Sequence, residues 1–108
     1  MITSKNPYTG EVIEEFKEYT KEEINNAIKK ADDRYKTWRK VSFSEKSKLL
    51  KNAAKELRDN KQSYAEDITQ EMGKPITQAL AEIEKCAWVC DFYAENAENQ
   101  LSNRVIET

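Results

Sequence analysis

The residues most able to do chemistry are two cysteines, Cys86 and Cys90, in a sequence that contains no histidine. The absence of histidine excludes Ser/His/Asp and Cys/His catalytic systems and most zinc sites. Thiols four residues apart on a helix share one face, but a closed metal site would still lack half of its ligands. The same spacing aims two sulfur atoms poorly for a disulfide. We therefore interpret both cysteines as small buried apolar residues, and we predict no catalytic, cofactor-binding or metal-binding residue in this chain.

The segment Gly73-Lys74-Pro75 has some likeness to a phosphate-binding loop. Such a loop needs a glycine five residues before the second glycine and a serine or threonine after the lysine. Ile68 and Pro75 stand at those positions. The segment instead predicts a corner between two helices, because glycine ends helices and proline suits their first turn.

Charged residues are numerous but point to no ionic partner. Residues 29–55 contain ten lysines and arginines, interleaved with the apolar positions of two expected helices. The basic side chains therefore form a solvated outer face, and we predict no nucleic-acid partner. Acidic pairs such as Asp32-Asp33, Glu22-Glu23 and Glu82 with Glu84 are interpreted as helix surface charge, since no apolar pocket is predicted around them.

The composition is that of one small domain. The chain has 108 residues, of which 38% are apolar and 35% are charged. Its longest uninterrupted apolar run, Cys86–Cys90, is too short to cross a membrane. The first residues show no basic head followed by an apolar segment, as a secretory signal would. We expect a cytoplasmic protein with no membrane partner.

Hydrophobic spacing predicts a mostly α fold, with a short N-terminal β-hairpin followed by three or four helices. The turn Asn6-Pro7-Tyr8-Thr9-Gly10 lies within a hairpin over 2–18. Capping-box patterns at Thr20 and Ser42 begin the first two helices. The expected helices span 20–40, 42–59, 61–73 and 75–101. The second and third are either separate, with a break at Asp59-Asn60, or one kinked helix, because the same apolar stripe resumes after the break.

The helix expected over 75–101 has an unusually wide apolar face. A normal stripe is broadened by further aromatic residues, and three short helices cannot cover it. We therefore predict self-association of the chain through Trp88, Phe92 and Leu101. The β-branched residues in Arg104–Thr108 predict strand-like structure at the end of the sequence.

Several of these segments resemble the amino-terminal portion of aldehyde dehydrogenases. Asn6–Ile13 is similar to the family's "NPxTGE" hairpin, and Ala27, Ala31 and Trp38 match its "A…A…W" helix. Glu71–Glu82 resembles the signature "E-x-GKP-x-x-x-A-x-x-E". Lys85–Glu95 looks most like the succinate-semialdehyde dehydrogenase branch.

The resemblance implies an enzyme that oxidises an aldehyde, in this branch succinate semialdehyde, to the acid with NAD or NADP. Its catalytic cysteine, its glutamate and its cofactor motifs lie downstream of the region that this sequence matches. The resemblance thus implies that 1–108 is a single partial domain, the N-terminal part of the cofactor-binding region in the larger α/β fold, and inactive alone. Its partners would be the remainder of the parent enzyme and further copies in a homo-oligomer. The alternative is a self-contained helical protein-interaction module.

The resemblance also implies a site on the last helix. One face of this helix borders the substrate entrance in aldehyde dehydrogenases, and Ala81 and Lys85 fall one turn apart at the matching positions. In the full-length enzyme, Lys85 would attract an anionic semialdehyde by its charge. The alternative is that Lys85 is an ordinary solvent-facing helix residue.

Overall fold

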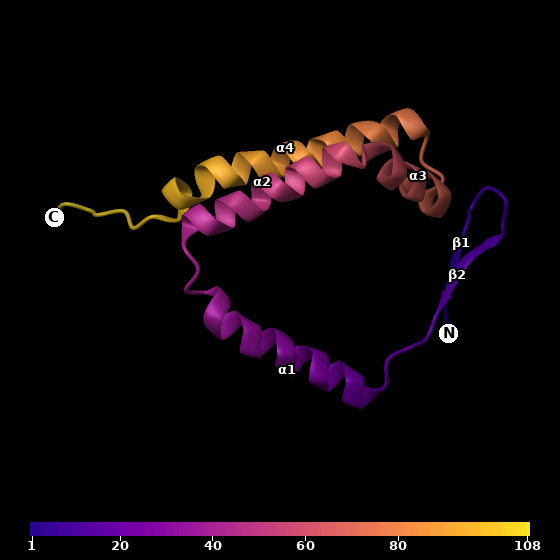
Figure 1. Cartoon of the computed structure of the whole chain (residues 1–108), viewed down its shortest axis with the longest axis horizontal. Helices are drawn as coiled ribbons and strands as arrows, with labels where there is room; N and C mark the ends of the chain where they lie inside the picture. Colours follow the sequence, from indigo (N-terminus) through magenta and orange to yellow (C-terminus); the bar gives the residue numbers. More distant parts are fainter.

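The computed structural model describes residues 1–108, and it confirms a mostly α chain with a short hairpin at its start (Figure 1). Both strands lie within the expected hairpin over 2–18, and the four helices begin and end within two residues of the expected ranges. In order they are β1 (Ile2–Lys5), β2 (Val12–Phe16), α1 (Lys21–Trp38), α2 (Phe43–Asp59), α3 (Lys61–Met72) and α4 (Ile76–Leu101).

The hairpin forms around the expected turn. Strands β1 and β2 pair antiparallel, with Ile2 opposite Phe16. The Asn6 side chain accepts hydrogen bonds from the backbone N–H groups of Tyr8 and Thr9, at 2.9 and 3.2 Å. Gly10 has φ 75°, a conformation that glycine adopts without steric cost.

The starts of α1 and α2 are capped to different extents. Thr20 and Glu23 form a complete capping box, in which each residue's side chain accepts a hydrogen bond from the other's backbone N–H. Ser42 accepts from the backbone N–H of Glu45 at 3.2 Å, but the Glu45 side chain makes no bond in return. The second capping box is therefore only half formed. Ser42 nevertheless caps α2, which begins at Phe43 as the pattern predicts.

The chain between α2 and α3 breaks at Asn60, so the two helices are separate. Asn60 has φ −111° and ψ 20°, outside the helical region. Its side-chain amide and its backbone N–H both donate to the Glu56 carbonyl, at 3.1 Å each, so Asn60 closes the last turn of α2.

Three helices, α2, α3 and α4, pack together, with α4 running back along α2 and α3 (Figure 1). The buried residues at these contacts are nearly all alanines, which allow close approach of the helix backbones. They are Ala54, Ala65, Ala79, Ile83 and Ala87. Gly73, with φ 71°, ends α3 in the left-handed conformation, and Pro75 directly precedes α4.

Helix α1 stands apart from this bundle and buries none of its residues (Figure 1). Its apolar side chains form an exposed stripe, with Ile28 at 63% and Tyr35 at 58% of full exposure. The contact seen at its end is the Lys46 ammonium lying 5.1 Å from the centre of the Trp38 ring.

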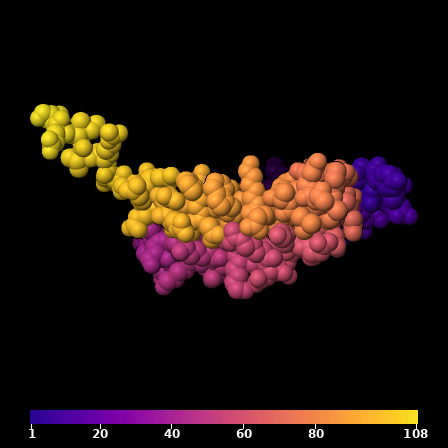
Figure 2. All heavy atoms as spheres, turned by 90° about the horizontal axis from the view of Figure 1, so that it is seen from above, coloured from indigo at the N-terminus to yellow at the C-terminus, as the bar shows by residue number.

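The molecule as a whole is extended. Its radius of gyration is 19.1 Å, where a compact chain of this length has about 13 Å. Its accessible surface is 9189 Å², against about 6,200 Å² for a compact monomer of this mass. Residues 103–108 form no strand and extend away from the bundle (Figure 2). The expectation of a strand there is wrong for this structure, because no neighbouring strand is present to pair with it.

Candidate functional site

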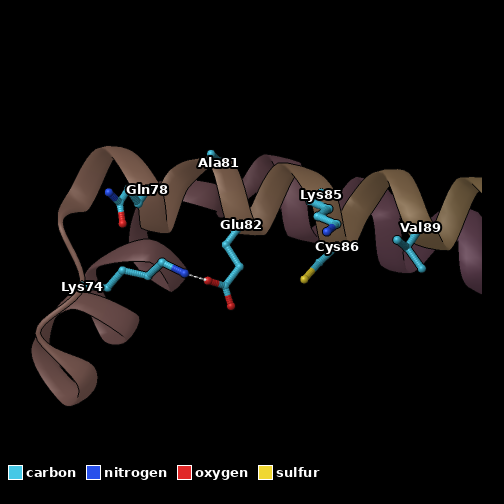
Figure 3. Close-up of a pocket in the computed structure, with 7 residues that line it drawn as sticks. All are labelled: Lys74, Gln78, Ala81, Glu82, Lys85, Cys86 and Val89. Atoms are coloured by element: carbon cyan, nitrogen blue, oxygen red, sulfur yellow. Dashed lines mark hydrogen bonds and ion pairs between the residues drawn. The ribbon is translucent and has the colours of Figure 1, made fainter.

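An open groove lies on α4, next to the corner between α3 and α4 (Figure 3). Its volume is about 730 Å³, enough for a small organic molecule. It contains both residues that the family resemblance assigns to a substrate entrance, Ala81 and Lys85. The lining residues are Lys74, Gln78, Ala81, Glu82, Lys85, Cys86 and Val89.

Charges in the groove are partly paired. Lys74 reaches from the corner to the Glu82 carboxylate on α4 and forms an ion pair with it (Figure 3). Lys85, one turn further along α4, is exposed and forms no ion pair. The groove therefore combines one neutralised lysine with one unpaired cation.

The two cysteines occupy different environments, and both are free thiols. Cys90 is half-buried, but Cys86 is exposed and lines the groove. The interpretation of Cys86 as a buried apolar residue is wrong, because α2 and α3 cover the side of α4 that carries Ile83 and Ala87. No cluster of three or more cysteine, aspartate or glutamate side chains is placed to hold a metal ion.

A second group of charges joins α2 to α4. The Arg58 guanidinium donates to the Glu84 carboxylate at 3.0 Å and to the Asp91 carboxylate at 2.7 Å. The Lys61 ammonium lies 3.6 Å from Glu84. Hydrogen bonds to Asp91 and then to Glu84 raise the pKa of Arg58. The hydrogen bond from Arg58 lowers the pKa of Glu84. Glu84, predicted as plain surface charge, thus takes part in a contact between helices.

The predicted self-association residues do not form one surface. The rings of Trp88 and Phe92 lie one turn apart with centroids 5.8 Å apart, and the Tyr93 ring meets Phe92 edge-on at 5.3 Å. Trp88 is 59% exposed and Phe92 is 38% exposed. Leu101 is 71% exposed, but it follows Phe92 by nine residues, or about two and a half turns, and so lies on the opposite side of α4. The exposed aromatic face consists of Trp88, Phe92 and Tyr93.

Sequence reasoning missed Lys74, Gln78 and Glu82 as neighbours of Lys85. Gln78, Glu82 and Lys85 follow one another at spacings of four and three on a single helix, which places them on one face. That spacing was available in the sequence. The position of the Lys74 side chain beside Glu82 could not be predicted from the sequence, because it depends on the angle at which α3 meets α4.

The whole chain, residues 1–108, matches the model of the aldehyde dehydrogenase family. The chain belongs to this family. The match covers the hairpin, the corner and α4 together, so it confirms the resemblance that the separate motifs indicated.

Two curated relatives have names of the same branch. The chain is 36% identical over 107 residues to a Synechocystis protein named "Probable succinate-semialdehyde dehydrogenase", specified for NADP(+), covering 99% of the chain and 24% of the relative. It is 38% identical over 98 residues to the Escherichia coli succinate semialdehyde dehydrogenase Sad, covering 91% of the chain and 21% of the relative. The chain thus spans about a quarter of the length of these relatives.

Solved structures show the same arrangement of elements. Succinic semialdehyde dehydrogenase from Streptococcus pyogenes, solved in complex with NADP+, superposes with a TM-score of 0.92 and 34% identity, over 98% of this chain and 24% of that one. Gox0499 superposes with a TM-score of 0.95 and 32% identity, over 100% of this chain and 24% of that one. The extended arrangement of the hairpin, α1 and the bundle is therefore that of one region in a larger enzyme structure. No helix in the chain is both long enough and apolar enough to cross a membrane.

Proposed function

We propose that the chain acts as the N-terminal, cofactor-domain portion of an NAD(P)-dependent aldehyde dehydrogenase that oxidises succinate semialdehyde to the acid. The observation that carries this proposal is the family match over residues 1–108, together with relatives named for that substrate. The surrounding reducing cytoplasm that we expect for such an enzyme suits two free thiols.

The residues present do not form a dinucleotide site. Binding of a dinucleotide pyrophosphate usually requires a glycine-rich turn between a strand and a helix. Gly10 closes the hairpin and Gly73 ends α3, so neither belongs to such a turn. We therefore assign this region a structural role, and we derive no cofactor chemistry from its own side chains.

That role follows from the uncovered surface. The chain exposes roughly 3,000 Å² more than a compact monomer of its mass would. The apolar part of this surface would stabilise the protein when it is covered, by about 25 cal/mol for each Å². The exposed stripe of α1 and the aromatic face of α4 are the surfaces that we propose for contact with the remainder of the enzyme.

The groove on α4 is the proposed entrance for substrate. Ala81, with its small side chain, keeps the groove open, and Lys85 supplies an unpaired positive charge. A cation about 7 Å from a carboxylate attracts it by several tenths of a kcal/mol in water. This attraction raises the local concentration of an aldehyde that carries a carboxylate, and it leaves a neutral aldehyde unaffected.

A chimera tests the proposed function directly. The chain would replace the aligned region of the Synechocystis relative, and NADP+ reduction would be measured with succinate semialdehyde and with butanal, a neutral aldehyde of equal length. We expect a soluble enzyme that oxidises succinate semialdehyde. A folded, NADP+-binding chimera without turnover would overturn the proposal.

The same chimera tests the role of Lys85. Lys85→Glu should raise KM for succinate semialdehyde about threefold or more and leave KM for butanal unchanged. Lys51→Glu, the same charge reversal on the exposed side of α2, is the matched control. Equal changes in KM for both aldehydes would remove Lys85 from the entrance.

We also propose that the enzyme forms a homo-oligomer. In the isolated chain, the exposed aromatic face would self-associate, because contiguous apolar surface of this kind is rare on monomers. Light scattering coupled to size-exclusion chromatography should give a dimer or larger species, which Trp88→Glu should shift toward monomer. A well-folded monomer at high concentration would instead favour the second candidate, a self-contained interaction module, since α2, α3 and α4 already share a small core.

A further inference from the structure

We propose that Glu82 sets the charge of the groove on α4. By pairing with Lys74, it leaves Lys85 as the one unpaired cation, and the groove then suits a small organic anion that carries a single carboxylate. This inference rests on the proposed function for the substrate class. The charge arrangement itself can be tested on the chain alone.

The position of Lys74 is fixed from two sides. The Ser4 hydroxyl of β1 donates a hydrogen bond to the Glu71 carboxylate, at 2.7 Å, just before the corner. Gly73 has φ 71°, and a Cβ added there would lie 3.2 Å from the Pro7 side chain of the hairpin. The hairpin thus packs against the corner that carries Lys74, so the backbone of this lysine has a defined position.

From the corner, the Lys74 side chain extends to Glu82 in the groove. Glu82 is the only acidic residue among the groove's lining residues, and Lys74 forms its ion pair. Figure 3 shows the two side chains meeting beside α4, with Cys86 one turn beyond Glu82 on the same side of the helix. With this pair neutral, Lys85 gives the groove a net charge of one positive unit.

Nearby acids are already engaged. Glu84 pairs with Arg58 and Lys61, and Glu71 accepts the hydrogen bond from Ser4. None of them lines the groove. Loss of Glu82 would therefore release Lys74 as a second cation.

Cys86 provides a built-in reporter of this charge. A thiolate attacks a methanethiosulfonate to form a mixed disulfide, and a sulfinate leaves. Reagents with an anionic sulfonatoethyl group or a cationic trimethylammonioethyl group differ mainly in charge. Both reagents react with the same thiolate, so the ionised fraction of the thiol cancels in the ratio of their rate constants. The ratio therefore measures the local electrostatic potential. A Cys86→Ser chain gives the contribution of Cys90.

At 0.1 M salt, each unit of charge roughly 7 Å from the reagent should change the anionic-to-cationic ratio about threefold. Glu82→Gln should therefore raise the ratio, and Lys85→Gln should lower it. Lys74→Gln should also lower it, because Glu82 then stands unpaired. The double variant Glu82→Gln/Lys74→Gln should return to the wild-type ratio. Glu98→Gln, three turns along α4 from Cys86, is the matched control and should change the ratio by less than about 20%.

Two results would overturn the inference: a Glu82→Gln ratio equal to wild type, or a double variant that keeps the raised ratio of Glu82→Gln. Because no aldehyde or cofactor is used, these results do not depend on the proposed enzyme activity. An inactive chimera with the expected ratios would contradict the proposed function and leave the charge arrangement standing.

Discussion

Helices α1 and α4 are both amphipathic, yet of these two only α4 packs against other helices of the chain. Helix α4 packs Ala79, Ile83 and Ala87 against α2 and α3, whereas α1 buries no residue. Both helices carry aromatic residues on an exposed face. An apolar stripe therefore specifies a helix and its inner face without specifying what covers that face.

The largest expected difference between the two regions is in the cost of removing an isoleucine. Ile83→Ala should lower the free energy of unfolding by about 3 kcal/mol, because it opens a cavity between α3 and α4. Ile28→Ala on α1 should change it by less than about 0.5 kcal/mol, since Ile28 is already 63% exposed. Urea titration of both variants checks the comparison. Similar losses would mean that α1 is packed after all.

The two glycines give the next largest contrast. Gly73→Ala should cost about 2 kcal/mol, because the left-handed backbone is strained with a Cβ and that Cβ would also crowd Pro7. Gly10→Ala has the same backbone cost, about 1 kcal/mol, with nothing within 4 Å of the new atom. Urea titration again measures both. Equal costs would show that the hairpin does not rest on the corner.

The helix caps offer a smaller but more local contrast. Thr20→Ala and Ser42→Ala each remove one capping hydrogen bond, worth about 1 kcal/mol. The first should reduce the helicity of α1 without lowering the Tm, because α1 is not part of the packed core. The second should lower the Tm. Circular dichroism at 222 nm during heating separates the two, and a lowered Tm for Thr20→Ala would contradict the separation.

The smallest expected effect concerns pH and belongs to the packed region alone. The hydrogen bond from Arg58 lowers the pKa of Glu84 in the folded chain. Its stabilising contribution is therefore present above the unfolded pKa, near 4.3, and is lost as the pH falls through the lower, folded pKa. The Tm should fall less on acidification for Glu84→Gln than for wild type. Parallel Tm curves would show that the Arg58 contact adds nothing, as is common for exposed ion pairs.

Much of the fold was predictable from local signals. The Asn6–Gly10 turn, the Thr20 capping box and the glycine stop at Gly73 each act over a few residues, so the sequence alone located the hairpin and the helix ends closely. The exposure of Cys86 and the pairing of Lys74 with Glu82 were not predictable in this way. The first depends on which side of α4 is covered by α2 and α3, and the second on how α3 and α4 cross. The motifs at the hairpin and the corner also pack against each other, through Pro7 and Gly73, across a long separation in sequence.

We propose that α1 is completed only by contact with the remainder of an aldehyde dehydrogenase. Hydrogen exchange, resolved by peptide, tests it most directly on the isolated chain and on the Synechocystis chimera. In the isolated chain, amides of Lys21–Trp38 should exchange within seconds to minutes, while those of α2 and α4 remain protected. In the chimera, α1 should become as protected as α4. Equal protection of α1 in both proteins would contradict the claim.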